Sequence, residues 1–304
     1  MLKVQLLRTL LVNTEAGPVH LSAASGLVRI GRQLYVVADD ENLLAVFDLD
    51  QPQAGSLRRI FDGELPYSFK ARKAAKPDLE ALTQLPAFPG YPQGALLALG
   101  SGSRMRRQRA ALLELNGQGE LHGVVREVDL SPLYIPLQAR HKRLNIEGAF
   151  VSQGRFCLLQ RGNAATPINV LINFDWVAIQ DWLRGAGPAP EAISTNQYDL
   201  GTIDGVPLCF TDGAALPDGG WVFCAAAEAT ADNDADGPVR GSAVGVVAAD
   251  GRLGTLLPLA LRCKTEGIAV TADKDLLRLL LVTDADDPAT PAMLLAAELA
   301  HSSG

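Results

Sequence analysis

The chain has 304 residues, of which 48% are hydrophobic and 20% are charged, and its formal net charge is −7. This composition supplies enough apolar side chains for a large core and excludes an intrinsically disordered chain. An acidic chain lacks the basic face that nucleic-acid binding normally needs, and no apolar run approaches the roughly 18 residues of a membrane helix. We therefore expect neither a nucleic-acid partner nor a membrane partner.

The first apolar segment, LKVQLLRTLLV at residues 2–12, is interpreted as an edge strand. A signal peptide is the alternative interpretation of this segment. It is disfavoured because Arg8 interrupts the apolar run and no small-x-small cleavage site follows closely.

The four cysteines form no C-x-x-C pair, which argues against a zinc or redox motif. They are Cys157, Cys209, Cys224 and Cys263, and all lie in apolar, strand-like runs. We expect buried free thiols in a reducing compartment and therefore predict a cytoplasmic location. A disulfide between Cys209 and Cys263 is the alternative.

A short phrase recurs five times along the chain: an oxygen-bearing side chain, a tiny residue, and an apolar or small residue. The five copies are Ser25-Gly26-Leu27, Glu80-Ala81-Leu82, Glu147-Gly148-Ala149, Asp212-Gly213-Ala214 and Glu266-Gly267-Ile268. Each is followed by a second apolar run, at 33–39, 95–101, 155–161, 220–226 and 277–284, and by a third, at 43–49, 110–115, 169–174, 243–249 and 293–299. Short apolar runs bounded by turn residues are typical of buried strands.

A fourth, more polar strand follows in four of the five repeats, at 56–63, 120–128, 192–200 and 252–261. The fifth repeat has no room for one, because only AHSSG follows Leu299. The N-terminal edge strand can supply it. The pattern predicts one all-β domain over residues 1–304, a five-bladed β-propeller with four antiparallel strands per blade and the N-terminal strand closing the last blade. Six blades or a β-sandwich are the alternatives, and residues 175–185 are expected to form a short helix or an extended excursion.

The first strand of each propeller blade lines the central channel, so the oxygen-bearing residue of each phrase is expected in a ring around the axis. The tiny residue after it would let five strands crowd together. Carboxylates this close raise one another's pKa, and oxygen-only ligands suit calcium or magnesium rather than zinc. We predict a calcium site, with Ser25, Glu80, Glu147, Asp212 or its neighbour Thr211, and Glu266 as ligands. The alternative is a polar, water-filled channel in which these side chains cap strands.

The loops expected on this face carry both acidic and basic residues. A metal ion flanked by arginines is the usual apparatus for a phosphate group, so we predict an anionic small-molecule ligand. The predicted substrate-binding residues are Arg104, Arg161, Lys264 and Asp284. Asp39 or Asp40 would orient water, and Arg104, Arg161 and Lys264 would stabilise the leaving charge, with Arg161 also counted among the predicted catalytic residues. The alternative is that these loops are charged only because they are solvated.

The segment DNDADG at residues 232–237 is similar to the start of an EF-hand calcium loop. The glutamate expected at the end of such a loop falls on Ala243. We therefore interpret the segment as an acidic hairpin loop, with a second calcium site as the alternative.

The phrases IEGAF and TEGIAV, together with SGL and LYVVADDENLLAVFDL, resemble the blade openings of the phytase-like propellers, the domain named esterase-like activity of phytase. Five blades with one oxygen ligand each are similar to the calcium-activated nucleotidases, or apyrases, whose calcium lies in the channel. The resemblance implies calcium ligands at Ser25, Glu80, Glu147, Thr211 or Asp212, and Glu266. Two departures weaken the implication of nucleotide hydrolysis: Ala81 stands where apyrases have tryptophan, and Asp39-Asp40-Glu41-Asn42 stands where they have Asp-Arg-Thr-Gly.

Three functions are consistent with these patterns. The leading hypothesis is a calcium-binding propeller that binds, and as a metal-dependent phosphoester hydrolase would cleave, a phosphorylated or anionic small molecule. The second is a non-catalytic propeller that binds a ligand or a protein. The third is a glycosidase using Asp39, Glu80 and Glu147, which is disfavoured because aromatic residues make up only 6% of the chain. The sequence gives no indication of an oligomeric state.

Overall fold

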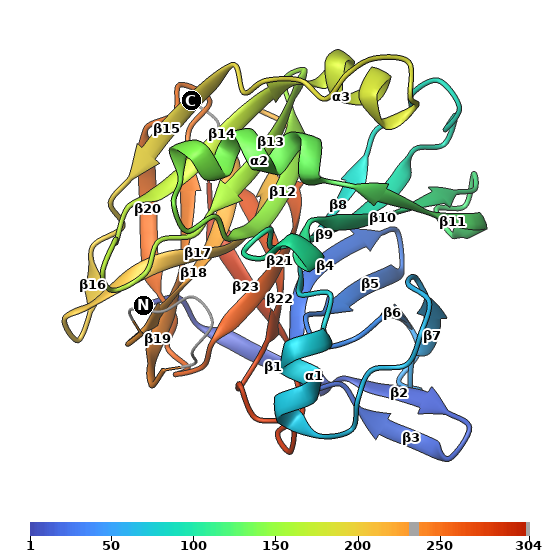
Figure 1. Cartoon of the computed structure of the whole chain (residues 1–304). Helices are drawn as coiled ribbons and strands as arrows, with labels where there is room; N and C mark the ends of the chain where they lie inside the picture. Colours follow the sequence, from blue (N-terminus) through green and yellow to red (C-terminus); the bar gives the residue numbers. More distant parts are fainter. Residues whose placement is uncertain (231–236, 302–304) are drawn as a thin grey trace.

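The computed structural model describes residues 1–230 and 237–301. Within these residues, five antiparallel sheets surround a central axis, and the predicted all-β, five-bladed β-propeller is confirmed (Figure 1). Residues 232–236, most of the EF-hand-like segment, lie outside the described part of the chain. No helix in the described part is both long enough and apolar enough to span a membrane.

The strands follow one another from the axis outwards in each blade. Blade 1 contains β4 (Ala24–Ile30), β5 (Gln33–Ala38), β6 (Leu43–Asp48) and β7 (Ser56–Arg59). Blade 2 contains β8 (Leu79–Leu85), β9 (Ala95–Gly100), β10 (Arg109–Leu115) and β11 (Leu121–Asp129). Blade 3 contains β12 (Ile146–Ser152), β13 (Arg155–Gln160), β14 (Asn169–Asp175) and β15 (Ser194–Tyr198). Blade 4 contains β17 (Val206–Ala215), β18 (Trp221–Glu228), β19 (Val239–Val247) and β20 (Leu253–Pro258), with the two-residue strand β16 (Thr202–Ile203) added beside β17.

Blade 5 is built from both ends of the chain, as predicted. Its inner strands are β21 (Thr265–Asp273), β22 (Leu276–Thr283) and β23 (Met293–Ala300), and its outer strand is the N-terminal β1 (Val4–Thr9). The two terminal strands pair antiparallel, from Val4 opposite Ala297 to Thr9 opposite Met293. The following hairpin, β2 (Leu11–Thr14) and β3 (Gly17–His20), forms a separate two-stranded sheet.

Apolar side chains fill the spaces between neighbouring blades. The buried residues form five clusters, each combining side chains of two adjacent blades. Strands that are buried on both faces require mainly apolar runs, which explains why the second strand of each repeat is an apolar segment, interrupted in blade 5 by the exposed Arg278. The four cysteines are free thiols, and Cys263 is the one that is only partly buried.

Each inner strand contains a β-bulge at the same place, where one residue has no partner in the ladder. The unpaired residues are Ser25, Glu80, Glu147, Thr211 and Glu266. The recurring sequence phrase is therefore a bulge repeated in every blade. In blade 4 the bulged residue is Thr211, whereas Asp212 is paired with Cys224.

The tiny residue after the bulge is needed because neighbouring inner strands almost touch. A Cβ atom on Gly26 would lie 2.8 Å from the backbone nitrogen of Leu82 in blade 2. A Cβ atom on Gly267 would lie 2.9 Å from the Cβ of Leu27 in blade 1. The crowding at the axis that was expected from the sequence is thus present at both positions.

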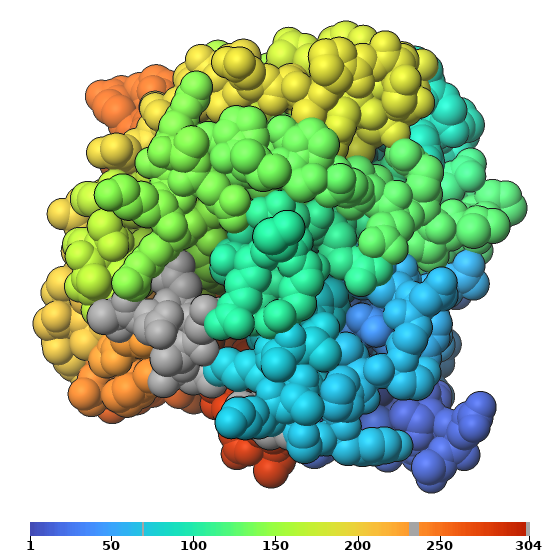
Figure 2. All heavy atoms as spheres, in the orientation of Figure 1, coloured from blue at the N-terminus to red at the C-terminus, as the bar shows by residue number. Residues whose placement is uncertain are grey.

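Three helices and one short 3-10 helix, η1 (Met105–Arg107), interrupt the strands of the described chain. The helices are α1 (Phe69–Ala75), α2 (Ser131–Arg140) and α3 (Trp176–Leu183). The last corresponds to the helix expected at 175–185, and the Asp175 carboxylate caps it by accepting a hydrogen bond from the Ala178 amide. The sequence did not indicate α1 or α2, which lie on the face of the ring that is turned towards the viewer in Figures 1 and 2.

Candidate functional site

A narrow cavity of about 70 Å³ lies on the propeller axis, and all five blades contribute to its walls. Its ionisable lining consists of eight carboxylates and five lysine or arginine side chains. The carboxylates are Asp39, Asp78, Glu80, Glu147, Glu228, Glu266, Asp284 and Asp286, and the cations are Lys73, Lys76, Arg107, Arg161 and Lys264. We call this the axial cavity. Its lining carries more carboxylates than cations.

Most of these side chains come from three positions that repeat in every blade. The first is the bulged residue of the inner strand. The second lies two residues before it, at Ala23, Asp78, Asn145, Cys209 and Lys264. The third position lies towards the end of the second strand or directly after it. The last residue before each bulge pairs with a residue of that strand, and the third position is the residue directly after this partner: Asp39, Ser101, Arg161, Ala226 and Asp284. In four blades the amide at the third position donates a hydrogen bond to the carbonyl at the second, which fixes both at the mouth of the channel.

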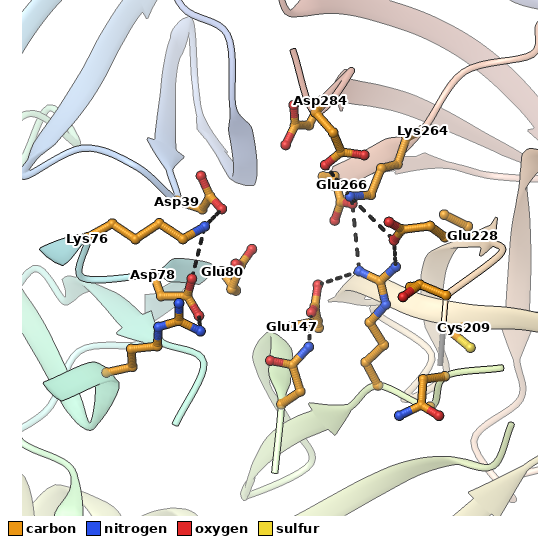
Figure 3. A pocket seen from close by; sticks show the side chains of 18 of the residues that line it. Asp39, Lys76, Asp78, Glu80, Glu147, Cys209, Glu228, Lys264, Glu266 and Asp284 are labelled. Carbon is orange, nitrogen blue, oxygen red and sulfur yellow. Dashed lines mark hydrogen bonds and ion pairs between the residues drawn. The ribbon is translucent and has the colours of Figure 1, made fainter. Parts of the chain in front are cut away.

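An ion-pair network around Lys76 lies on the side of blades 1 and 2 (Figure 3). The Lys76 ammonium contacts Oδ2 of Asp39, and it lies 3.0 Å from Oδ1 of Asp78. The other oxygen of Asp78 lies 3.0 Å from the Arg107 guanidinium and accepts a hydrogen bond from the Ser101 hydroxyl. Asp78 has a positive φ of 59°, and it is held by three partners in a buried position.

A second network lies across the cavity, on the side of blades 3, 4 and 5 (Figure 3). The Arg161 guanidinium lies 3.2 Å from Glu147 and 2.7 Å from Glu228. Lys264 lies 3.1 Å from Glu266, 3.6 Å from Glu228 and 2.7 Å from Asp286. Both cations are therefore neutralised by carboxylates in this structure.

Two of the glutamates at the bulge positions have carboxylates that accept no hydrogen bond within the described residues. Glu80 makes no hydrogen bond or ion pair there, and it faces the cavity between the two networks (Figure 3). Neither oxygen of Glu266 accepts a hydrogen bond within the described chain, although its side chain is only 4% exposed. Lys264 and Arg161 lie near Glu266 and offset its charge. Glu80 is half-buried and has no such partner in the described chain, so its side chain indicates room for a further cation.

The pKa values of the cavity carboxylates reflect this excess of negative charge. Burial raises the pKa of Asp39 to about 6 and the pKa of Glu147 to about 8, although Lys76 and Arg161 oppose these shifts. Burial, together with the carboxylates of Glu147 and Asp39, raises the pKa of Glu80 well above its usual range. Burial acts in the same direction on Glu228, but Lys264 and Arg161 outweigh it and leave the pKa of Glu228 below its ordinary value.

The five-residue ring predicted from the sequence divides into two groups in the structure. Glu80, Glu147 and Glu266 line the axial cavity. The hydroxyl of Ser25 donates to the Ala23 carbonyl at 3.1 Å, and that of Thr211 donates to the Thr265 carbonyl at 2.7 Å. These two side chains, and Asp212, are absent from the cavity lining.

The predicted substrate-binding and catalytic residues are likewise distributed over different places. Asp39, Arg161, Lys264 and Asp284 line the axial cavity. Asp40 lies outside it and pairs with Arg72 at 3.3 Å. Arg104 is exposed at the start of η1 and lines neither the axial cavity nor the pocket described next.

A wider pocket of about 310 Å³ adjoins the axial cavity between blades 1 and 5 and α1. It is lined by Ser22, Ala23, Asp39, Asp40, Glu41, Tyr67, Arg72, Lys73, Lys76, Asp284, Asp286, Asp287 and Pro288. We call it the mouth pocket. Asp39 and Lys76 belong to both spaces, and Tyr67 at the rim is fully exposed. The two spaces therefore share a wall that includes part of the Lys76 network.

The donor atoms that best fit a metal ion belong to Asp39, Asp78 and Glu80. One carboxylate oxygen from each lies within 4.8 Å of the others, and this is the one such group of three acidic, histidine or cysteine side chains in the described residues. Oxygen-only donors suit calcium or magnesium. The group lies towards blades 1 and 2 and includes one of the five residues of the predicted ring, Glu80.

Three important cavity residues were not among the predicted site residues: Lys76, Asp78 and Glu228. Asp78 could have been found by extending the repeat alignment two residues upstream of each bulge, where Lys264 occupies the same position. Lys76 follows α1 and Glu228 ends β18 beyond the repeated positions, so the repeat gives no signal for either.

Over residues 20–299 the chain matches a family described as a family of unknown function, DUF6929. The chain belongs to this family. No curated protein matches the DUF6929 chain in sequence. The resemblance to phytase-like propellers and apyrases stays a prediction.

Two solved structures share the architecture of the DUF6929 chain. The glutaminyl cyclase of Myxococcus xanthus has a TM-score of 0.51 at 10% identity, with 98% of this chain and 97% of that chain covered. The endo-arabinase of Bacteroides thetaiotaomicron has a TM-score of 0.50 at 10% identity, with coverages of 97% and 98%. At this identity the likeness concerns the fold alone.

Proposed function

We propose that the protein binds a divalent metal ion, calcium or magnesium, in the axial cavity through Asp39, Asp78 and Glu80. The observation that carries this proposal is the approach of their three carboxylate oxygens to within 4.8 Å of one another. Glu80 supports it, because its carboxylate has no protein partner among the described residues. Within the described chain, Lys76 and Arg107 offset the charges of Asp39 and Asp78 but leave Glu80 without an ion pair, and a bound cation would compensate this remaining carboxylate.

The proposed ligand set is smaller than the ring predicted from the sequence. Glu147 and Glu266 line the same cavity, but Arg161 and Lys264 already neutralise them. Ser25 and Thr211 use their hydroxyls to hold the backbone. Three protein ligands would leave several coordination positions of calcium open, because calcium takes six to eight oxygens. We propose that an oxygen of an anionic small molecule fills such a position.

Metal binding is tested by elemental analysis of the purified protein and by melting curves with calcium and with chelator. An ion present at about 100 times its dissociation constant stabilises the folded state by about 2.7 kcal/mol, so the melting temperature should rise with calcium. Glu80→Gln should abolish that rise, whereas the exposed control Glu191→Gln should retain it. The absence of both bound metal and a calcium-dependent shift in the wild-type protein would rule the proposal out.

A second candidate function, metal-dependent phosphoester hydrolysis, is favoured by the position of Arg161 between two unlike carboxylates. The pKa of Glu147 is raised to about 8 and that of Glu228 is lowered, and such pairs serve as acid and base in hydrolases. A bound divalent ion would add Lewis-acid polarisation of the phosphoryl oxygen. The non-catalytic alternative is a propeller that binds the same anion without cleaving it.

The two candidates are separated by assaying p-nitrophenyl phosphate with calcium or magnesium. Hydrolysis should be lost with chelator and should fall by about 100-fold or more in Glu147→Gln, the usual contribution of a general acid or base. Exposed Glu191→Gln should hydrolyse at the wild-type rate. Binding of the ester without turnover in every variant would leave the binding function and reject the hydrolase.

A further inference from the structure

We propose that Lys76 occupies the position of the divalent ion when no ion is bound, and that, once displaced, it binds an oxyanion in the mouth pocket. This inference rests on the proposed metal site. It assigns the mouth pocket as the subsite for the anionic ligand and makes ion binding the condition for ligand binding. The Lys76 side chain is the element that couples the two events.

The first step is the competition between Lys76 and an ion for the same two carboxylates. The Lys76 ammonium contacts Oδ2 of Asp39 and lies 3.0 Å from Oδ1 of Asp78, and both carboxylates belong to the group of three that fits a metal. The Lys76 side chain is only 11% exposed, so water screens its charge poorly. An ion held by these carboxylates would repel the ammonium at such short range in a poorly solvated space, so we expect the ion to displace it.

A second observation shows that the cavity has capacity for a further cation when Lys76 is in place. Glu80 lines the axial cavity, belongs to the group of three carboxylates that fits a metal, and makes no hydrogen bond or ion pair within the described residues. Figure 3 shows Glu80 and Glu266 on opposite sides of the cavity, with Glu80 free of any drawn interaction. Lys76 therefore compensates the charges of Asp39 and Asp78 and leaves the carboxylate of Glu80 without an ion pair in the described chain.

The displaced ammonium has a place to go without any rearrangement of the fold. Lys76 follows directly after α1, and it lines the mouth pocket as well as the axial cavity. Arg72 on α1 pairs with Asp40 and Glu41, which anchors the helix to blade 1 independently of Lys76. A lysine has a flexible four-carbon stem, so rotation of this side chain alone can move its charge from one space to the other.

An oxyanion is the ligand that this displaced state would recognise. In the mouth pocket it would meet the ammonium of Lys76 and the open coordination positions of an ion bound to Asp39, which lines both spaces. A cation together with a metal ion is a common arrangement for phosphoryl and carboxylate groups. The pocket volume of about 310 Å³ accommodates such a group on a small organic body, and the exposed ring of Tyr67 offers that body an apolar contact.

The competition is tested by calorimetric titration of calcium chloride into wild-type protein, Lys76→Met and Lys70→Met. Lys70 is exposed on α1, just before Lys76, so its variant makes the same charge change away from both spaces. Lys76→Met should bind calcium roughly 10-fold more tightly or better, because a like charge is removed from the site, and Lys70→Met should match the wild type. Equal calcium affinities of the wild type and Lys76→Met would overturn the inference while leaving the metal site standing.

The subsite is tested by titrating glycerol 2-phosphate and glycerate into the same proteins with calcium and with chelator. Wild-type protein should bind at least one of these oxyanions about 10-fold more tightly with calcium, and Lys76→Met should lose most of that gain. The tighter of the two probes identifies the anionic group as phosphoryl or carboxylate. Calcium-independent binding of both probes, or no binding of either, would reject the subsite.

A measurement on the wild-type protein covers the case in which Lys76→Met does not fold. Acetylation with a small reagent, followed by mass spectrometry, reports how accessible each lysine is. Calcium should increase labelling of Lys76 several-fold, because the ammonium leaves its buried ion pairs, and should leave labelling of Lys70 unchanged. Bound calcium with unchanged Lys76 labelling would overturn the inference, whereas failure of every variant to bind calcium would remove the proposed metal function itself.

Discussion

The carboxylate of Asp212 in blade 4 accepts a hydrogen bond from the backbone amide of Ile268 in blade 5 at 2.9 Å. Its other oxygen accepts from the amide of Gly213 at 2.7 Å. Asp212 is buried, and burial raises its pKa well above the usual range although these amides oppose the shift. It therefore joins the inner strands of blades 4 and 5.

Asp212→Asn should destabilise the protein by about 1–3 kcal/mol. An asparagine can accept one of the two amide bonds through its oxygen, but its NH₂ group then faces the remaining buried N–H, which is left without an acceptor. Urea unfolding midpoints would measure the effect. Asp250→Asn is the matched control, because Asp250 accepts an amide bond from Arg252 on the exposed surface; an equal loss in both variants would contradict the assigned role.

Gly26→Ala should cost about 1–3 kcal/mol of stability, the usual range for overpacking. The added methyl group would lie 2.8 Å from the Leu82 backbone nitrogen in the next blade, and a backbone atom cannot move aside without disturbing the sheet. Gly117→Ala is the control, since a Cβ atom there meets nothing within 4 Å. Thermal unfolding of the two variants should separate them clearly, and similar melting temperatures would argue against crowding at the axis.

Arg161→Met should lower the free energy of unfolding by about 3–5 kcal/mol, as expected when one partner of a buried ion-pair network is removed. The variant leaves Glu147 and Glu228 without their shared guanidinium. Arg155→Met, which makes the same substitution at the exposed start of β13, should change stability little. Chemical denaturation of both variants at neutral pH checks the prediction, and a fully stable Arg161→Met would show that the network does not hold blades 3 and 4 together.

The stability of the ion-free protein should decrease as the pH rises from about 5 to about 9. The pKa of Glu147 is raised from 4.5 to about 8, so the folded state favours its protonated form. The resulting stabilisation is complete below the ordinary pKa and is lost as the pH rises through about 8. Glu147→Gln should flatten this dependence when urea midpoints are compared in chelator, whereas Glu191→Gln should follow the wild-type curve. An unchanged pH dependence in the Glu147→Gln variant would contradict the raised pKa.

The fold was predictable because the inner strand of every blade contains a β-bulge at the same place. In four of the five blades a very small residue directly follows the unpaired residue of the bulge, and this leaves a recognisable phrase. The apolar second and third strands follow from burial on both faces. The phrase also located Glu80, Glu147 and Glu266 at the cavity. It could not distinguish Thr211 from Asp212, because both carry oxygen next to Gly213 and only the strand register shows which one is unpaired.

The ion pairs of the cavity could not be predicted from the sequence, because most of the partners come from segments that are far apart along the chain. Lys76 reaches Asp39 and Asp78 because the segment carrying α1 returns to the axis, and a seven-residue helix with three basic residues has no amphipathic signature. Arg161 meets Glu228 across 67 residues of chain. The sequence showed Arg161 and Lys264 as cations without their partners, and they were therefore predicted to bind an oxyanion. In the structure each of them forms ion pairs with several carboxylates.

The antiparallel pairing of β1 with β23 has a consequence for the order in which the molecule is made. During synthesis the first strand emerges from the ribosome long before its partner at residues 293–300 exists, so blade 5 must wait while the other four sheets can already assemble. Until then, the backbone of β1 has no partner along the edge that later pairs with β23. The nascent chain is therefore vulnerable at β1 to incorrect strand pairing or to binding by a chaperone. In the completed ring the same edge of β1 is hydrogen-bonded to β23 and closes blade 5.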